Sequence, residues 1–407
     1  VRLFRRLNFP AKSGWISVLF LIPIIFLLVD KELTTRTQIA STRHELQGIE
    51  YTKPLQDLIA QAQTRRLLAI TGSGELAAGQ SKVTEAFDKL KATDKALSAD
   101  LSTAELFGAV DKLHQKLLAS PAGKDTAGTM AAHNELLDAL IALGLHVGNS
   151  SELALDPELE RFHLMNFTVL FAPTQTEEVS RLAALGWGAL KTTERNADLT
   201  EMVGESLGVL KYVETVLENS YVQATGGTPE ADAKYGMVAH DDAYEVFLTT
   251  AKKQLLIETP SGDADAFVRQ GLAVIQAKQT MNRKLMQRLE ERLQDRISEI
   301  RSAANLEHII ALTFVLIAFY MLLAFYKVMM GGLREVTGQL EQITKGNLVT
   351  APTPWGNDEA AHLMITLRDM EASLHVIVRN TLDGAGNVNT ASEEIAAASQ
   401  DLSRRTE

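Results

Sequence analysis

The sequence has no cysteine, few prolines and almost no strand-like alternation of Val, Ile and Thr. Its 407 residues include 10 prolines and no cysteine. The missing thiols exclude a disulfide framework, a thiolate zinc site and a cysteine nucleophile. Apolar residues recur instead at helical spacing along most of the chain, so we predict an all-α fold.

The sequence also lacks an excess of basic residues and the common motifs for metal binding, phosphate binding and nucleophilic catalysis. The net charge is −11, and no Lys/Arg cluster is interleaved with aromatics, which argues against a nucleic-acid partner. The nine histidines show no metal-ligand spacing, and no phosphate-binding glycine loop or nucleophile arrangement is present. We therefore expect no enzyme activity, no cofactor and no metal site.

Two long apolar runs are the most informative features. Residues 309–326 hold no charge and are long enough to cross a bilayer core of roughly 30 Å as a helix. Residues 14–29 form a second apolar run that ends at Asp30. A core helix of a soluble protein and a cleaved signal peptide are the alternatives, but no A-x-A cleavage pattern follows the first run. We predict membrane helices at 13–30 and 309–327.

The flanking charges predict the orientation of these helices. Residues 1–12 contain Arg2, Arg5, Arg6 and Lys12 and no acid, so they are expected to stay in the cytoplasm. Residues 31–308 are then outside the membrane, and the second span returns the chain to the cytoplasm. Lys327 at that end of the span agrees with this orientation.

The outer region, residues 31–308, is predicted to be helical throughout. The expected helices cover 31–71, 81–98, 103–119, 125–147, a segment that starts with Asp156 as N-cap and Pro157, then 175–196, 199–224, 229–257, and 263 onward into the second span. These are about twice the segments that one four-helix bundle needs. We therefore expect two helical modules stacked along the long first and last helices.

Arg66 is the main candidate ligand residue in the outer region. It interrupts a stripe of small and apolar residues between positions 48 and 69, so its guanidinium is expected inside a bundle. There it could clamp a ligand carboxylate, with Arg65 assisting, which would make an organic acid the ligand. The alternatives are an internal pair with an acid such as Glu158 or Glu160, or extension to solvent.

Three further residues are weaker candidates for contact with a small polar ligand. His163 and Asn166 lie three positions apart and share a helix face. They could instead satisfy each other or a nearby backbone group. Tyr51 could close a pocket near one end of a helix.

Two short apolar stripes follow the second span, in residues 328–380. The first contains Leu333, Val336, Leu340 and Ile343 and ends at Gly346-Asn347-Leu348; the second contains Leu363, Leu367, Met370, Leu374 and Ile377 and follows Asp358-Glu359. Two such helices cannot bury both stripes alone. We expect a parallel four-helix bundle formed with a second copy of the chain.

This pattern resembles a HAMP domain over residues 328–380. Gly331-Gly332 stands where that family usually has a proline, and Ala361 where it usually has a glycine. The tail VNTASEEIAAASQDLSRRTE, within 381–407, resembles the start of the signalling domain of methyl-accepting chemotaxis receptors. The segment LDPELERFHLMN, residues 155–166, is similar to one in helical bimodular sensor domains.

The resemblance implies a homodimeric chemoreceptor of the bacterial inner membrane with a periplasmic sensor region. Its ligand would be a small molecule or a ligand-loaded carrier protein. Receptor clusters, a coupling protein and a histidine kinase would be the other partners, the last two through a C-terminal hairpin expected beyond Glu407. Methylation sites are expected at or beyond the same point, and Glu393, Glu394 and Glu407 are more simply solvated coiled-coil residues.

Two other functions share these spans. A membrane sensor kinase needs a phospho-accepting histidine just past the relay, followed by an acid and then a proline. His375 lies within the relay, the two-stripe segment of residues 328–380, and is followed by Val-Ile-Val-Arg, so it does not fit. A structural coiled-coil membrane protein would bind no ligand.

Overall fold

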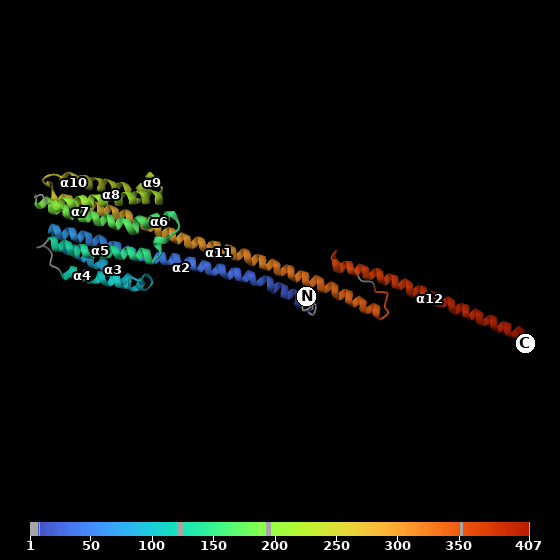
Figure 1. Ribbon diagram of the computed structural model, residues 1–407. Helices are drawn as coiled ribbons and strands as arrows, with labels where there is room; N and C mark the ends of the chain where they lie inside the picture. Colours follow the sequence, from blue (N-terminus) through green and yellow to red (C-terminus); the bar gives the residue numbers. More distant parts are fainter. Residues whose placement is uncertain (1–6, 8, 120–125, 193–196, 351–352, 407) are drawn as a thin grey trace. The chain divides into compact units, whose positions relative to one another are not determined.

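The computed structural model describes residues 7, 9–119, 126–192, 197–350 and 353–406 (Figure 1). Within these ranges every regular element is a helix and no strand occurs, so the all-α prediction is confirmed. Arg2, Arg5, Arg6, the predicted turn at 120–123 and Glu407 lie outside the described residues. The elements are α2 (Phe9–Thr71), α3 (Leu76–Leu101), α4 (Ala104–Ala119), α5 (Thr126–Ser150), η1 (Leu153–Leu155), α6 (Leu159–Met165), η2 (Asn166–Phe171), α7 (Ala172–Thr192), α8 (Ala197–Thr225), α9 (Pro229–Tyr235), α10 (Met237–Leu255), α11 (Ala264–Thr344) and α12 (Glu359–Thr406).

The chain divides into two compact units. One comprises residues 31–304, and the other comprises residues 1–30 together with 305–407. The long helices α2 and α11 each contribute to both units.

In the unit of residues 31–304, one apolar core joins α2, α3, α4 and α5. Leu58, Leu90, Val110 and Leu140, one from each helix, are all fully buried in it. Apolar residues three and four positions apart on each helix form the faces that meet here. This group is a four-helix arrangement around the outer part of α2.

A second helix group in the same unit joins α7, α8, α10 and α11. Phe247 of α10 stacks on Phe267 of α11, with ring centroids 4.9 Å apart. Toward η2, Phe167, Leu217 and Leu289 form a further buried cluster. Aromatic and leucine side chains from four helices therefore fill this core.

The two helix groups lie side by side, at the same level along α2. Gln56 of α2 donates to the Thr168 carbonyl of η2 at 2.6 Å, and Gln63 donates to Thr176 of α7 at 3.3 Å. Nearby, Arg65 of α2 donates to Gln80 of α3. We predicted two modules stacked along the long helices; in the structure η2 and α7 instead run back parallel to α2, so both helix groups contact the same stretch of α2.

Several predicted helix boundaries differ from the observed ones, such as the predicted 81–98, which is observed as Leu76–Leu101, and two of the differences have a local cause. The helix expected at Pro157 begins at Leu159, because the Asp156 carboxylate accepts from the Glu158 amide at 2.9 Å and holds this turn outside the helix. The single helix expected over 229–257 is broken at Gly236, whose φ of +89° ends α9 before α10 begins.

Two helices, α2 and α11, are long and apolar enough to cross a membrane. None of the residues in their apolar windows is buried within the structure. In the unit of residues 1–30 and 305–407, Phe9 and Phe325 bring the two helices together, with ring centroids 5.9 Å apart. Long apolar segments left uncovered by protein suit a lipid environment.

Candidate functional site

Arg66 lies inside the protein and is held by protein groups. Its guanidinium pairs with the Glu177 carboxylate of α7 through two contacts, Nη1–Oε1 at 2.8 Å and Nη2–Oε2 at 3.1 Å. Nη1 also donates to Asn134 of α5 at 2.7 Å. Arg66 therefore joins α2, α5 and α7, in the internal-pair arrangement considered above but with Glu177 as its acid.

The other predicted ligand residues do not converge on one site. Tyr51 donates to Asp94 of α3 at 2.8 Å, and the Arg65 guanidinium lies 2.6 Å from His133 of α5. Asn166 donates to Ser220 of α8 at 2.8 Å, while the His163 ring lies edge-on to Phe162. Tyr51, Arg65 and Asn166 each contact another helix, whereas the His163 ring contacts its neighbour on α6.

A buried ionic cluster forms where α6 meets α2 and α11. Arg161 binds both oxygens of Asp156, at 2.6 Å and 3.1 Å. Arg296 of α11 reaches Glu45 of α2 at 3.3 Å and Asp156 at 3.7 Å. Burial and the nearby Asp156 charge raise the pKa of Glu45 to about 7.

The same contact continues along α11. Arg292 pairs with both Glu158 and Glu160 at 3.0 Å, and Arg288 pairs with Glu160 at 2.9 Å. Because these arginines and Arg296 are four residues apart, they form one row on α11 that faces the acidic start of α6. The conspicuous LDPELERFHLMN segment thus serves to attach α6 to α11.

A cavity lies at the junction of α2, α7 and α11. Its volume is about 40 Å³, which is room for a few water molecules, and its polar lining includes Gln63, Thr176, Lys278 and Asn282. The neighbouring element η2 is a π-helix, a geometry that leaves backbone groups out of the regular ladder. Its Thr168 carbonyl accepts from Gln56 of α2 and, at 3.2 Å, from Asn282 of α11.

Lys278 is the most unusual side chain that lines this cavity. It is 1% exposed, and its Nζ has no hydrogen-bond partner among the described residues. The ammonium lies over the Phe167 ring, 4.9 Å from the centroid. Burial lowers the pKa of Lys278 to about 8, although the charges of Glu214 and Asp241 act in the opposite direction.

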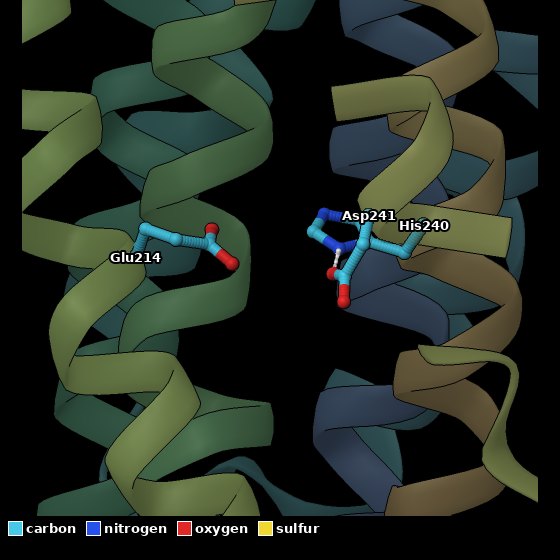
Figure 2. Close-up of side chains that lie close together, drawn as sticks. All are labelled: Glu214, His240 and Asp241. Atoms are coloured by element: carbon cyan, nitrogen blue, oxygen red, sulfur yellow. Dashed lines mark hydrogen bonds and ion pairs between the residues drawn. The ribbon is translucent and has the colours of Figure 1, made fainter. Parts of the chain in front are cut away.

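Glu214 of α8 points toward His240 and Asp241 of α10 (Figure 2). His240 is buried, Glu214 is half-buried and Asp241 is exposed. One ligand atom from each lies within 4.8 Å of the others, a spacing that a divalent cation could bridge. Lys278 opposes that use, because its ammonium is close enough to lower the pKa of His240 and would repel a bound cation. The two carboxylates are near enough to act on the pKa of Lys278, but neither accepts a hydrogen bond from its ammonium.

In the other unit, the end of α11 and the start of α12 pack side by side in the same direction. Val336, Met364 and Leu367 form a small core with Ile343 beside it. The approach is close, since a Cβ on Gly332 would lie 2.5 Å from the Ala360 Cβ. Gly332, one of the residues that depart from the HAMP pattern, thus lies at this contact.

The connection between these helices is fixed by their caps. Gly346 has a φ of +82°, and the Asn347 amide reaches back to the Gln342 carbonyl at 3.0 Å. Asp358 caps α12 by accepting from the Ala361 amide at 2.9 Å. Of the other predicted relay residues, Glu359 starts α12, Leu348 and Leu374 are half-buried, and Leu340 and Met370 are exposed.

The sequence interpretation missed Lys278 and the π-helix. Lys278 lies among Val274, Ile275 and Met281 at helical spacing, the same pattern that drew attention to Arg66. Pro173, just inside α7, cannot donate a backbone hydrogen bond and signals an irregular helix before it. Both signals were present, but neither shows which helices meet there.

Comparisons of the chain with family models, with curated proteins and with solved structures found no match. The functional interpretation therefore rests on the residues and their geometry.

Proposed function

We propose that this protein is a transmembrane receptor that senses a small molecule outside the membrane and relays the signal to a cytoplasmic coiled coil. The observation that carries the proposal is the continuity of α11. This one helix contributes core residues to the bundle, contains an apolar window long enough to span a membrane, and ends in the packed segment with α12. A rigid helix can transmit a small shift or rotation between these parts.

The ionic row on α11 supports such a transmission. Three arginines connect α11 to α6 and α2 through ion pairs: Arg288, Arg292 and Arg296. They lie just before α11 leaves the unit of residues 31–304. A ligand that favours one packing of these helices would bias the position of α11. The coupling free energy must come from its different affinity for the two packings.

The relay is proposed to act as a homodimer, as in a HAMP domain over residues 328–380. Leu340 and Met370 remain exposed beside the small core of Val336, Met364 and Leu367. A second copy in parallel register would cover them. Residues 381–407, the last part of α12, would then begin the signalling coiled coil of a chemotaxis receptor in the bacterial inner membrane.

The absence of native cysteine allows a direct test of the orientation. Lys252→Cys in α10 and Asp383→Cys in α12 each add one thiol at an exposed position. A membrane-impermeant maleimide applied to intact cells should label the first variant and spare the second until the membrane is lysed. Equal labelling of both variants before lysis would contradict the proposal.

A second test addresses the dimer. Met370→Cys should form a disulfide-linked dimer in membranes under mild oxidation, since this exposed apolar position is expected at the interface. Asp369→Cys, one position away on another face of α12, is the matched control. Equal cross-linking of the two variants would argue against a specific relay dimer.

A further inference from the structure

We propose that the cavity between α2, α7 and α11 binds the carboxylate of a small hydroxy acid, with Lys278 as its counter-ion. This inference rests on the proposed receptor function, for which it supplies the sensory site. It replaces Arg66, whose guanidinium is already occupied by Glu177.

The buried charge of Lys278 favours an anionic ligand. The Lys278 ammonium is buried without a hydrogen-bond partner in the described part of the chain, and its contact with the Phe167 ring replaces only part of its lost hydration. Arg66, at a similar depth, has a carboxylate partner in Glu177, which contacts both of its terminal nitrogens. Since the flexible lysine side chain lines the cavity, a carboxylate there can supply the missing partner.

Hydrogen-bonding capacity narrows the ligand class. The Gln63 Oε1 and Asn282 Oδ1 atoms are also buried without partners, and both residues line the cavity. These are acceptors, whereas Lys278 is a donor. A carboxylate beside a hydroxyl group offers an acceptor and a donor together, which a simple carboxylate does not.

Size and access agree with a small ligand. The cavity of about 40 Å³ has room for a carboxylate with its neighbouring carbon. Next to it is a groove of about 460 Å³ that shares Gln56, Asp57 and Arg283 with the cavity lining. Arg283 is exposed and has no ion pair with any described residue, so it can attract an anion toward the mouth.

The test uses the full chain in lipid nanodiscs, titrated calorimetrically with lactate, glycolate, acetate and methylammonium at about pH 8.5. Lactate and glycolate should bind more tightly than acetate, and methylammonium should not bind. Because a carboxylate favours the charged lysine, binding should take up protons, seen as a heat that depends on the buffer.

The variants separate the site from the fold. Lys278→Met should weaken lactate binding by at least about tenfold and abolish proton uptake, without lowering the melting temperature. Lys284→Met removes an exposed lysine six residues along α11 and should preserve both signals. Unchanged lactate affinity in Lys278→Met would overturn the proposal. Failure of the wild-type chain to bind any of the carboxylates at ligand concentrations up to about 20 mM would also overturn it. The labelling and cross-linking tests do not depend on this site and would still report on the receptor function.

Discussion

Arg66, Glu45 and Lys278 are all buried, yet the protein accommodates their charges in three different ways. Arg66 has a paired carboxylate, and Glu45 has one arginine contact beside a second acid. Lys278 has no hydrogen-bonding partner in the described structure. For a buried ion pair, attraction between the partners offsets the cost of removing both charges from water. A buried charge without a partner has no such compensation and lowers the free energy of unfolding. This contrast marks Lys278 as the functional candidate.

At Glu45 we predict a specific pH dependence. Its pKa rises from 4.5 to about 7 in the folded protein, so folding favours the protonated form. This contribution to stability is fully present below pH 4.5 and is lost as the pH rises to about 7. At pH 8, Glu45→Gln should therefore be more stable than the wild type by about 1–3 kcal/mol and melt at a higher temperature. Near pH 4.5 the two proteins should melt at the same temperature.

The control for this measurement is Glu50→Gln, an exposed glutamate on the same helix. Its effect should stay within about 0.5 kcal/mol across the pH range. A difference between Glu45→Gln and the wild type that did not change with pH would rule out titration of Glu45.

At Arg66 we predict a structural effect. Arg66→Ala leaves the buried Glu177 carboxylate without its main partner and should destabilise the protein by about 3–5 kcal/mol in denaturant unfolding. Arg181, which also contacts Glu177, would recover part of this loss. The double variant Arg66→Met, Glu177→Leu should be more stable than Arg66→Ala, and if it is not, the pair is not the source of the effect.

At the scale of elements, close helix contacts depend on small residues and on caps. In the relay, Gly332 lets α11 and α12 approach each other, while Gly346 and Asp358 end one helix and start the next. In the bundle, the π-helix η2 and Gly236 interrupt what the apolar pattern predicts as regular helix. These interruptions position the cavity and the relay core.

Gly332→Leu should separate α11 from α12 in the relay, because even a Cβ there would lie 2.5 Å from the Ala360 Cβ. Spin labels on Glu335→Cys and His362→Cys, both exposed positions, would report this as a longer distance by electron paramagnetic resonance. Gly338→Leu is the control, since a Cβ at Gly338 meets nothing within 4 Å. An unchanged distance in Gly332→Leu would mean that this contact does not set the spacing.

At the scale of the whole molecule, α11 is the proposed link between sensing and relay. It carries Lys278 at the cavity, the arginine row, the apolar window and Val336 of the relay core. A change at the cavity can therefore reach the relay without passing through a loop.

Breaking α11 between the arginine row and the apolar window should uncouple these parts. Ser302→Pro removes a backbone hydrogen bond and clashes with the carbonyl four residues earlier, at a cost of about 3 kcal/mol or more to the helix. Lactate binding should persist, while the distance change that lactate causes between the Glu335→Cys and His362→Cys labels should disappear. Persistence of that change in Ser302→Pro would show that coupling does not need a continuous α11.

The sequence by itself determined the all-α fold, the two apolar helices and the burial of Arg66. These follow from periodicity, run length and the position of a residue on its own helix, all of which are local properties. The predicted end of the first outer helix at residue 71 was also confirmed, and Gly72, with a φ of +66°, follows it directly.

Only the tertiary structure decided which helices meet. The sequence predicted a buried arginine but not Glu177 as its acid, since the two lie 111 residues apart. It also predicted stacked modules, whereas the return of α7 alongside α2 places two helix groups side by side. The cavity and its unpartnered lysine exist only because α2, η2, α7 and α11 converge, and such long-range packing leaves no periodic signal in any one of them.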